Sequence, residues 1–293
     1  MGCDIHIIAE VKENGVWKKN TNKVFLNPYY EMYKGIKVTD PARYKEIKKG
    51  NWIDLKKFMD EPSSGRNYNW FAVLADVRNG RGFAGIKTGE GFDPIADPKG
   101  FPSDASRETM EFLGMVIDDN MTMDDYKENG GEIDLGNGDY KYVYPRLKII
   151  DWGCKYLDEE ETIAENVDYH SYSYFTAKEL AEFDWKGKMT MLRGTISLEQ
   201  YKSLQEKGGE PTEGWCGASW GKGFVTVDED QADKILKDGV EGTEFEGKTI
   251  KVNYHWMDGY HKMFEHELKT IVEPLKKLSM KYEDARIVFA FDN

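Results

Sequence analysis

The chain has 293 residues, of which 40% are hydrophobic and 32% charged, and its formal net charge at pH 7 is −13. It is long enough to bury a large core, and no apolar run reaches the roughly 20 residues that a bilayer-spanning helix requires. The acidic balance disfavours a nucleic-acid polymer as partner, because gripping phosphates requires a basic surface. With three scattered cysteines, the composition predicts a globular cytoplasmic protein without a membrane partner, and homo-oligomerisation stays open.

The opening MGCDIHIIAEV predicts a strand over residues 3–11, because apolar side chains alternate along it. This alternation turns Cys3 to an apolar face and places Asp4 and His6 together on the opposite face, with Cα atoms roughly 6.5–7 Å apart. The ENG sequence at 13–15 then predicts a tight turn into a second strand.

A first insertion is predicted at about 20–65, where the apolar pattern breaks up apart from a short helical stretch at 54–59. Its basic stretch, residues 43–57, is interrupted by acidic side chains and is typical of a solvated face. WFAVLADVRN, residues 70–79, predicts a buried helix rather than a strand, and a Gly-rich loop follows over 80–101.

Helix-capping signals recur after this loop. Ser103 or Asp104 is predicted to cap a helix, and a second, acidic insertion is predicted at 118–168. Thr176 with Glu179 spells a capping box, which predicts that a helix starts there. A third insertion is predicted at about 205–250.

The C-terminal part predicts a long helix over residues 259–281, interrupted or kinked at Pro274, followed by the strand ARIVFAFDN. The C-terminus is apolar, and a chain end is ordered only when a sheet or a packed helix holds it. We therefore expect the first and last strands to lie in one central sheet. The fold class predicted is α+β, with a mixed or antiparallel central sheet, several short helices and one long C-terminal helix in a single domain, 1–293.

The stretch GRGFAG matches the G-x-G-x-x-G pattern of dinucleotide-binding loops. That motif requires a helix behind the glycines, and the following IKTGEGFDP cannot form one, so a plain flexible loop is favoured. Loops of this length often belong to binding sites. Arg78, Arg81 and Lys87 are the cations predicted to meet an anionic substrate there.

A candidate site combines the two chain ends with one histidine from the middle. Asp4 and His6 suit either two ligands of one metal ion or an imidazole oriented by a carboxylate. His170 and Asp292 are predicted to complete the catalytic set, and Asp4, His6 and His170 are the predicted ligands of a divalent metal such as zinc or manganese. The alternative is a solvated sheet face without chemistry.

His170 and Ser171 precede the capped helix, and a helix N-terminus favours anions. Ser171 and Asp104 are therefore predicted to contribute to substrate binding. The alternative is that these side chains only cap the helix and line a loop.

Five stretches carry a resemblance to a known family. They are MGCDIH at the start, FAVLADVRN, PKGFPSDAS at 98–106, HSYSYFTAKEL at 170–180 and the closing RIVFAFDN. On these motifs the chain resembles a family of bacteriophage, and occasionally bacterial, proteins that open with M-G-C-D-I-H. The resemblance implies a cytoplasmic setting in an infected bacterium, and it carries no catalytic role onto any residue.

Two functions stay open at this point. One is a hydrolase that acts on a small anionic or nucleotide-like substrate, with Asp4, His6 and His170 either as ligands of a divalent metal or as an acid–base set. The other is a binding protein without turnover, which sequesters a host nucleotide signal or inhibits a host defence protein through an aromatic-rich surface. The shared face of Asp4 and His6 favours the enzyme, because a binding protein needs no carboxylate–imidazole pair.

Overall fold

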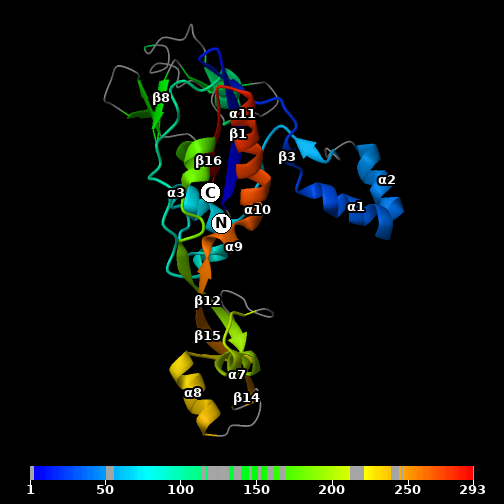
Figure 1. The fold of residues 1–293 in the computed structure, drawn as a ribbon, viewed down its shortest axis with the longest axis vertical. Coiled ribbons are helices and arrows are strands. Elements are labelled where there is room, and N and C mark those ends of the chain that lie inside the picture. Colours follow the sequence, from blue (N-terminus) through cyan, green and yellow to red (C-terminus); the bar gives the residue numbers. More distant parts are fainter. Residues whose placement is uncertain are drawn as a thin grey trace. The chain divides into compact units, whose positions relative to one another are not determined.

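The computed structural model describes residues 3–50, 56–113, 169–211, 221–238, 244–245 and 247–292, with residue 124 and six short strands between 116 and 164 (Figure 1). The described residues form two compact units. Unit 1 lies within Met1–Asn67, Ile95–Phe183 and Glu265–Asn293, and unit 2 lies within Tyr68–Pro94 and Asp184–Phe264. Helices and mainly antiparallel strands occur in both, so the predicted α+β class is confirmed. The single domain with insertions stays a prediction.

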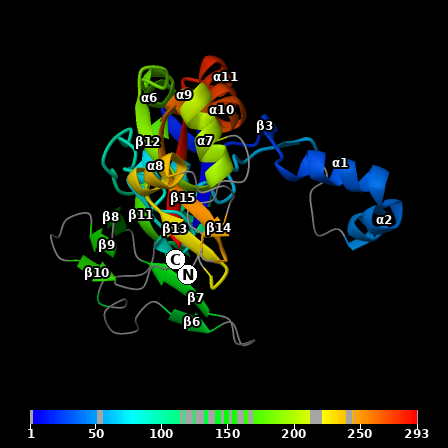
Figure 2. The ribbon, with the colours of Figure 1, turned by 90° about the horizontal axis from the view of Figure 1, so that it is seen from below.

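The centre of unit 1 is a four-stranded antiparallel sheet in the order β11-β16-β1-β2. Its strands are β1 (Asp4–Glu13), β2 (Val16–Lys19), β11 (Tyr169–Thr176) and β16 (Asp284–Asp292). The strands β1 and β16 lie side by side (Figures 1 and 2) and pair from Asp4 opposite Asp292 to Lys12 opposite Asp284. Both terminal strands therefore belong to the central sheet, as predicted.

The turn between β1 and β2 is the one that the ENG sequence predicts. Asn14 and Gly15 have φ of 52° and 78°, and Glu13 pairs with Val16 across them. Two consecutive residues with positive φ define the type I′ hairpin turn, which Asn-Gly favours because both residues tolerate the left-handed region.

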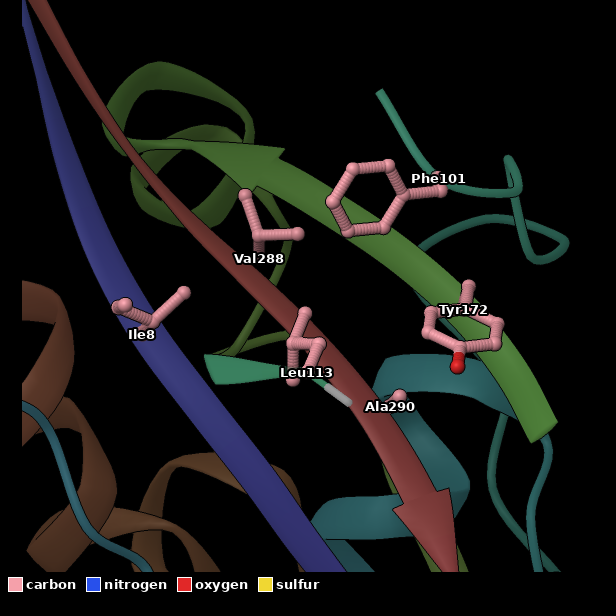
Figure 3. Close-up of a cluster of buried hydrophobic side chains, with 6 residues drawn as sticks. All are labelled: Ile8, Phe101, Leu113, Tyr172, Val288 and Ala290. Carbon is pink, nitrogen blue, oxygen red and sulfur yellow. The ribbon is translucent and has the colours of Figure 1, made fainter. Parts of the chain in front are cut away.

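One face of this sheet carries a buried apolar cluster (Figure 3). Ile8 comes from β1, Val288 and Ala290 from β16, and Tyr172 from β11, while Phe101 and Leu113 close the cluster from outside the sheet. Ile8, Tyr172 and Val288 have no exposed surface. Burial of a side chain of this size contributes about 1.5–3 kcal/mol, so the cluster anchors the terminal strands to the rest of the unit.

The helix after the Pro-rich turn is α4 (Arg107–Phe112), and it contacts β1 and β2. Its N-cap is Ser106, whose Oγ accepts the N–H of Thr109, so the prediction of Ser103 or Asp104 as the cap is wrong. The predicted capping box of Thr176 and Glu179 does open α6 (Ala177–Glu182), where each residue bonds the other's backbone N–H.

The predicted C-terminal helix is divided into short pieces. In unit 1 these are α10 (Glu265–Glu267), the π-helical segment η2 (Leu268–Val272) and α11 (Glu273–Lys281), and in unit 2 the piece is α9 (Tyr260–Met263). The break before α11 coincides with Pro274, which has no backbone N–H to donate to an α-helical ladder. Helix α11 packs against β16 and β1.

Unit 2 is built on a second sheet in which β15 (Lys248–Gly259) is central. It pairs antiparallel with β12 (Met189–Ser197) and β14 (Glu244–Phe245) and parallel with β13 (Phe224–Val227). Besides α9, the described helices of this unit are α3 (Tyr68–Ala75), the short η1 (Phe83–Gly85), α7 (Leu198–Lys207) and α8 (Glu229–Lys237). Helices α7 and α8 contact β15, and an apolar cluster around Tyr201 and Ile250 is buried there.

The first insertion contains two helices that the sequence did not predict, α1 (Tyr29–Thr39) and α2 (Pro41–Gly50). The stretch at 54–59, predicted as helical, instead ends in the strand β4 (Phe58–Met59), which pairs with β3 (Phe25–Leu26); residues 54–55 lie outside the described residues.

Most of the predicted acidic insertion 118–168 also lies outside the described residues. The strands described in this part of the chain are β5 (Val116–Ile117), β6 (Glu132–Asp134), β7 (Tyr140–Tyr144), β8 (Leu147–Ile150), β9 (Gly153–Tyr156) and β10 (Thr162–Ala164).

Candidate functional site

The pairing of β1 with β16 brings the polar ends of the two strands together. Asp4 lies opposite Asp292, and His6 lies opposite Ala290 two positions along. Because directly opposed residues of an antiparallel pair point to the same face, Asp4, His6 and Asp292 share one end of the face that carries Ile8. The structure thus gathers three of the four predicted catalytic side chains.

Asp292 is held by both of its oxygens. Its Oδ1 accepts the backbone N–H of Asp4 at 3.0 Å, and its Oδ2 lies 3.1 Å from Nε2 of His6. The backbone bond fixes the orientation of the carboxylate, and the carboxylate in turn favours the imidazole tautomer that carries its proton on Nε2. Within the part of the chain that the structure describes, Nδ1 of His6 has no hydrogen-bond partner.

Arg66 adds a cation to this site. Its Nε and Nη2 atoms donate to the two oxygens of Asp4. This hydrogen bonding lowers the pKa of Asp4 below its ordinary value; burial opposes the shift, and the nearby charges of Arg66 and His6 add to it. Asp4 and Arg66 remain 42% and 59% exposed, and His6 and Asp292 are 31% and 36% exposed, so solvent and small ligands reach all four side chains.

Tyr169 forms one wall of the site. It lies opposite Asp292 on β11, and its ring meets the His6 ring edge to face, with centroids 4.7 Å apart. The contact restrains the rotation of the imidazole. Neither Tyr169 nor Arg66 was predicted from the sequence. The face of Tyr169 follows once β11 is known to pair with β16, whereas no local signal relates Arg66 to Asp4.

His170, the fourth predicted catalytic residue, lies on the opposite face of the sheet. It pairs with Phe291, the neighbour of Asp292, and stacks on that ring with centroids 6.0 Å apart. Its Nδ1 lies 2.9 Å from Oγ of Ser171, and both residues are buried. Adjacent strand residues point to opposite faces. Tyr169 rather than His170 therefore joins His6.

The predicted metal site is not formed by its predicted ligands. Among the described residues, no group of three or more His, Cys, Asp or Glu side chains is placed to hold a metal ion. Asp4 and His6 lie on the face away from His170, and both oxygens of Asp4 are engaged by Arg66. The assignment of Asp4, His6 and His170 as ligands of zinc or manganese is corrected accordingly.

The five predicted substrate-binding residues are divided between the units. In unit 1, Asp104 pairs with Arg286 at 2.8 Å, and Ser171 occupies a β-bulge with φ of 52°. The described hydrogen bonds of these two residues do not involve His6.

Arg78, Arg81 and Lys87 belong to a tight hairpin in unit 2. Arg81 and Lys87 face each other across a β-bridge, and Gly89 bridges to Leu192, which extends the sheet at β12. The glycines of GRGFAG therefore serve a hairpin and not the helix start that dinucleotide binding requires.

No family model, curated protein or solved structure matches this chain. Among the described residues, no helix has the length and apolar character needed to cross a membrane. The chemistry of the site must therefore be argued from its groups. A carboxylate-oriented imidazole can take up and return a proton, and an adjacent guanidinium favours an anionic ligand.

Proposed function

We propose that the chain is a hydrolase of small anionic or nucleotide-like substrates, with His6 and Asp292 as its acid–base pair. The observation that carries this proposal is the double hydrogen bonding of Asp292, which links the Asp4 backbone to the His6 imidazole at 3.0 and 3.1 Å. Such an arrangement supplies an oriented base at an accessible surface, which a purely structural strand end does not need.

In this mechanism each residue has one role. Asp292 holds the proton of His6 on Nε2, which leaves Nδ1 as the base. Nδ1 takes a proton from a water molecule as the water oxygen attacks the electrophilic phosphorus or carbonyl carbon of the substrate. The leaving group departs with the bonding electrons and recovers the proton from Nδ1. Arg66 attracts the anionic part of the substrate, and Tyr169 keeps the imidazole ring in place.

The resemblance to the family that opens with M-G-C-D-I-H supports the proposal that this activity takes place during phage infection. We place the protein in the cytoplasm of a phage-infected bacterium, where nucleotides are abundant small anions. The second candidate is a binding protein that sequesters a nucleotide signal or engages a host defence protein. It would use the same Arg66 and aromatic side chains without proton transfer.

The test is a hydrolysis assay on chromogenic phosphate and carboxylate esters and on nucleotides, with product analysis by chromatography. His6→Gln is expected to lower the rate by about 100- to 10,000-fold, the usual contribution of a general acid–base group. Asp292→Asn is expected to lower the rate because the amide no longer favours the reactive tautomer of His6. The loss should be smaller than for His6→Gln, because the imidazole is still present and the amide oxygen still accepts the Asp4 N–H.

The matched control is His255→Gln in unit 2. His255 also pairs with a carboxylate, Glu229, at 2.9 Å, is 44% exposed and has an arginine, Arg193, opposite it on β12. It differs from His6 in that a single oxygen of Glu229 meets both the backbone N–H and the ring of His255. This variant should keep the native rate. Equal rates for the native chain and His6→Gln would refute the acid–base role. Binding of an unaltered nucleotide without turnover would favour the second candidate.

A further inference from the structure

Helix α2 contributes no residue to the buried core of the described part of the chain. None of the ten residues from Pro41 to Gly50 is buried, and its described neighbour is α1, in which Tyr33 is buried (Figures 1 and 2). Helices shorter than about 12 residues are marginal in water unless packing supports them. A surface helix with so little packing is well suited to being covered by a partner.

The charge of α2 is opposite to that of the chain. Arg43, Lys45, Lys48 and Lys49 against Glu46 give 4 − 1 = +3, so the remaining residues sum to −13 − 3 = −16. All four cations are exposed, and none forms an ion pair with another described residue. Nucleic-acid binding depends on local charge, so α2 is an exception to the expectation drawn from the net charge of the chain.

The two half-buried apolar residues of α2 mark the side of the helix nearest to α1. Tyr44 and Ile47 are half-buried, and Lys37 of α1 lies 5.8 Å from the centre of the Tyr44 ring, so this side turns toward α1. Lys45, Lys48 and Lys49 follow i, i+3, i+4 spacing and therefore share one exposed face. We call these three residues the lysine face.

The start of α2 is defined by a cap. Asp40 Oδ1 accepts the backbone N–H of Arg43 at 3.0 Å. This acidic residue is therefore engaged at the helix N-terminus. Asp40 therefore does not neutralise the lysine face, whose first residue, Lys45, follows more than one helical turn later.

We propose that the lysine face of α2 binds the phosphate backbone of a nucleic acid, without reading its sequence. Lysines act as point charges for phosphates, whereas base reading favours the planar forks of arginine, asparagine or glutamine. This proposal is independent of the acid–base site.

Two other anionic partners fit less well. An interfacial membrane helix needs a large apolar face to bury in lipid, and the lysine face has none, since the apolar side chains of α2 turn toward α1. A protein interface is centred on aromatic or aliphatic anchors and is poor in lysine. The charge and composition of this face complement phosphate best.

The experiment measures binding of the full chain to labelled duplex and single-stranded DNA by fluorescence anisotropy over a series of salt concentrations. Three phosphate contacts give a slope of about −2.7 in log affinity against log salt, at about 0.9 per contact, which is an approximately 40-fold loss of affinity between about 50 and 200 mM salt. The variant Lys45→Gln/Lys48→Gln/Lys49→Gln should lose this dependence.

The matched control is Lys202→Gln/Lys276→Gln/Lys277→Gln, which removes the same charge from exposed positions on α7 and α11. It should bind as the native chain does, and circular dichroism should show equal helix content for both variants. The proposal is overturned if neither DNA binds, or if both variants bind equally well. It is also overturned if the lysine face is instead required for binding anionic vesicles or for self-association.

Discussion

One face of the β1–β16 pair carries charged groups at both ends, and the two ends differ in burial. At one end Glu10 lies opposite Arg286, with side chains 0% and 3% exposed. At the other end Asp4 and His6 approach Asp292, and all three side chains are between 31% and 42% exposed. The apolar cluster around Ile8 lies between them. We call the first the closed end and the second the open end.

The closed end is completed by α4 and by aromatic rings. Arg286 Nε donates to Glu10 at 2.7 Å, and its guanidinium carbon lies 4.0 Å from the centre of the Trp17 ring. The other oxygen of Glu10 accepts the Ser106 N–H and the Thr109 hydroxyl, both at 2.7 Å. The carboxylate therefore joins two strands to the start of a helix.

The difference between the ends separates structural from reactive charge. A buried ion pair is costly to break, because removing one partner leaves the other charge buried where water cannot solvate it. A half-exposed pair contributes little to stability, because water replaces the lost partner. The open end can therefore exchange its partners with a substrate at small cost to the fold.

The largest effect expected is at the closed end. Arg286→Met should lower the free energy of unfolding by about 3–5 kcal/mol, because it leaves Glu10 ionised and buried without its cation. Urea unfolding at neutral pH, followed by tryptophan fluorescence, measures the loss.

The control for this variant is Glu13→Gln, which breaks the exposed ion pair between Glu13 of β1 and Lys18 of β2. Its expected cost is below about 1 kcal/mol. Similar losses for the two variants would mean that the closed end is solvated and that the proposed contrast between the ends is wrong.

A smaller effect on stability is expected at the open end. Asp292→Asn and His6→Gln should each change the free energy of unfolding by less than about 1 kcal/mol, because both side chains keep contact with water. The same urea titration measures this change. A loss close to that of Arg286→Met would make the His6–Asp292 pair a structural element and would remove the ground for its catalytic role.

The closed and open ends also show how far the sequence could lead. Alternation along DIHII and RIVFAFD was sufficient to predict both terminal strands and the shared face of Asp4 and His6, because the strand period is local information. The ENG turn and the Thr176–Glu179 capping box could also be predicted, since each depends only on residues within four positions of one another.

The misses concern information that is not local. His170 was assigned to the site because it lies just ahead of a capped helix, whereas the alternation of β11, once paired with β16, places Tyr169 there instead. Arg66 reaches Asp4 from 62 positions away, and Arg286 reaches Glu10 from 276 positions away, and neither spacing leaves a periodic trace. Helix α2 was missed because none of its residues is buried, whereas α1 has apolar residues at helical spacing, Tyr29, Met32, Tyr33 and Ile36, and could have been predicted.

The smallest effect expected is on the titration of Asp4. Because Arg66 lowers the pKa of Asp4, the folded state binds a proton there less readily than the unfolded state. The ion pair therefore adds stability above the ordinary pKa of an aspartate, and this contribution disappears as the pH falls through the lowered value. Arg66→Gln should return the pKa of Asp4 toward its ordinary value, whereas Arg43→Gln on α2 should leave it unchanged. Carboxyl chemical shifts followed by NMR between neutral and acid pH test both variants. An unshifted Asp4 in the native chain would show that Arg66 does not hold this carboxylate in solution, and Arg66 would then be available to a substrate without first leaving Asp4.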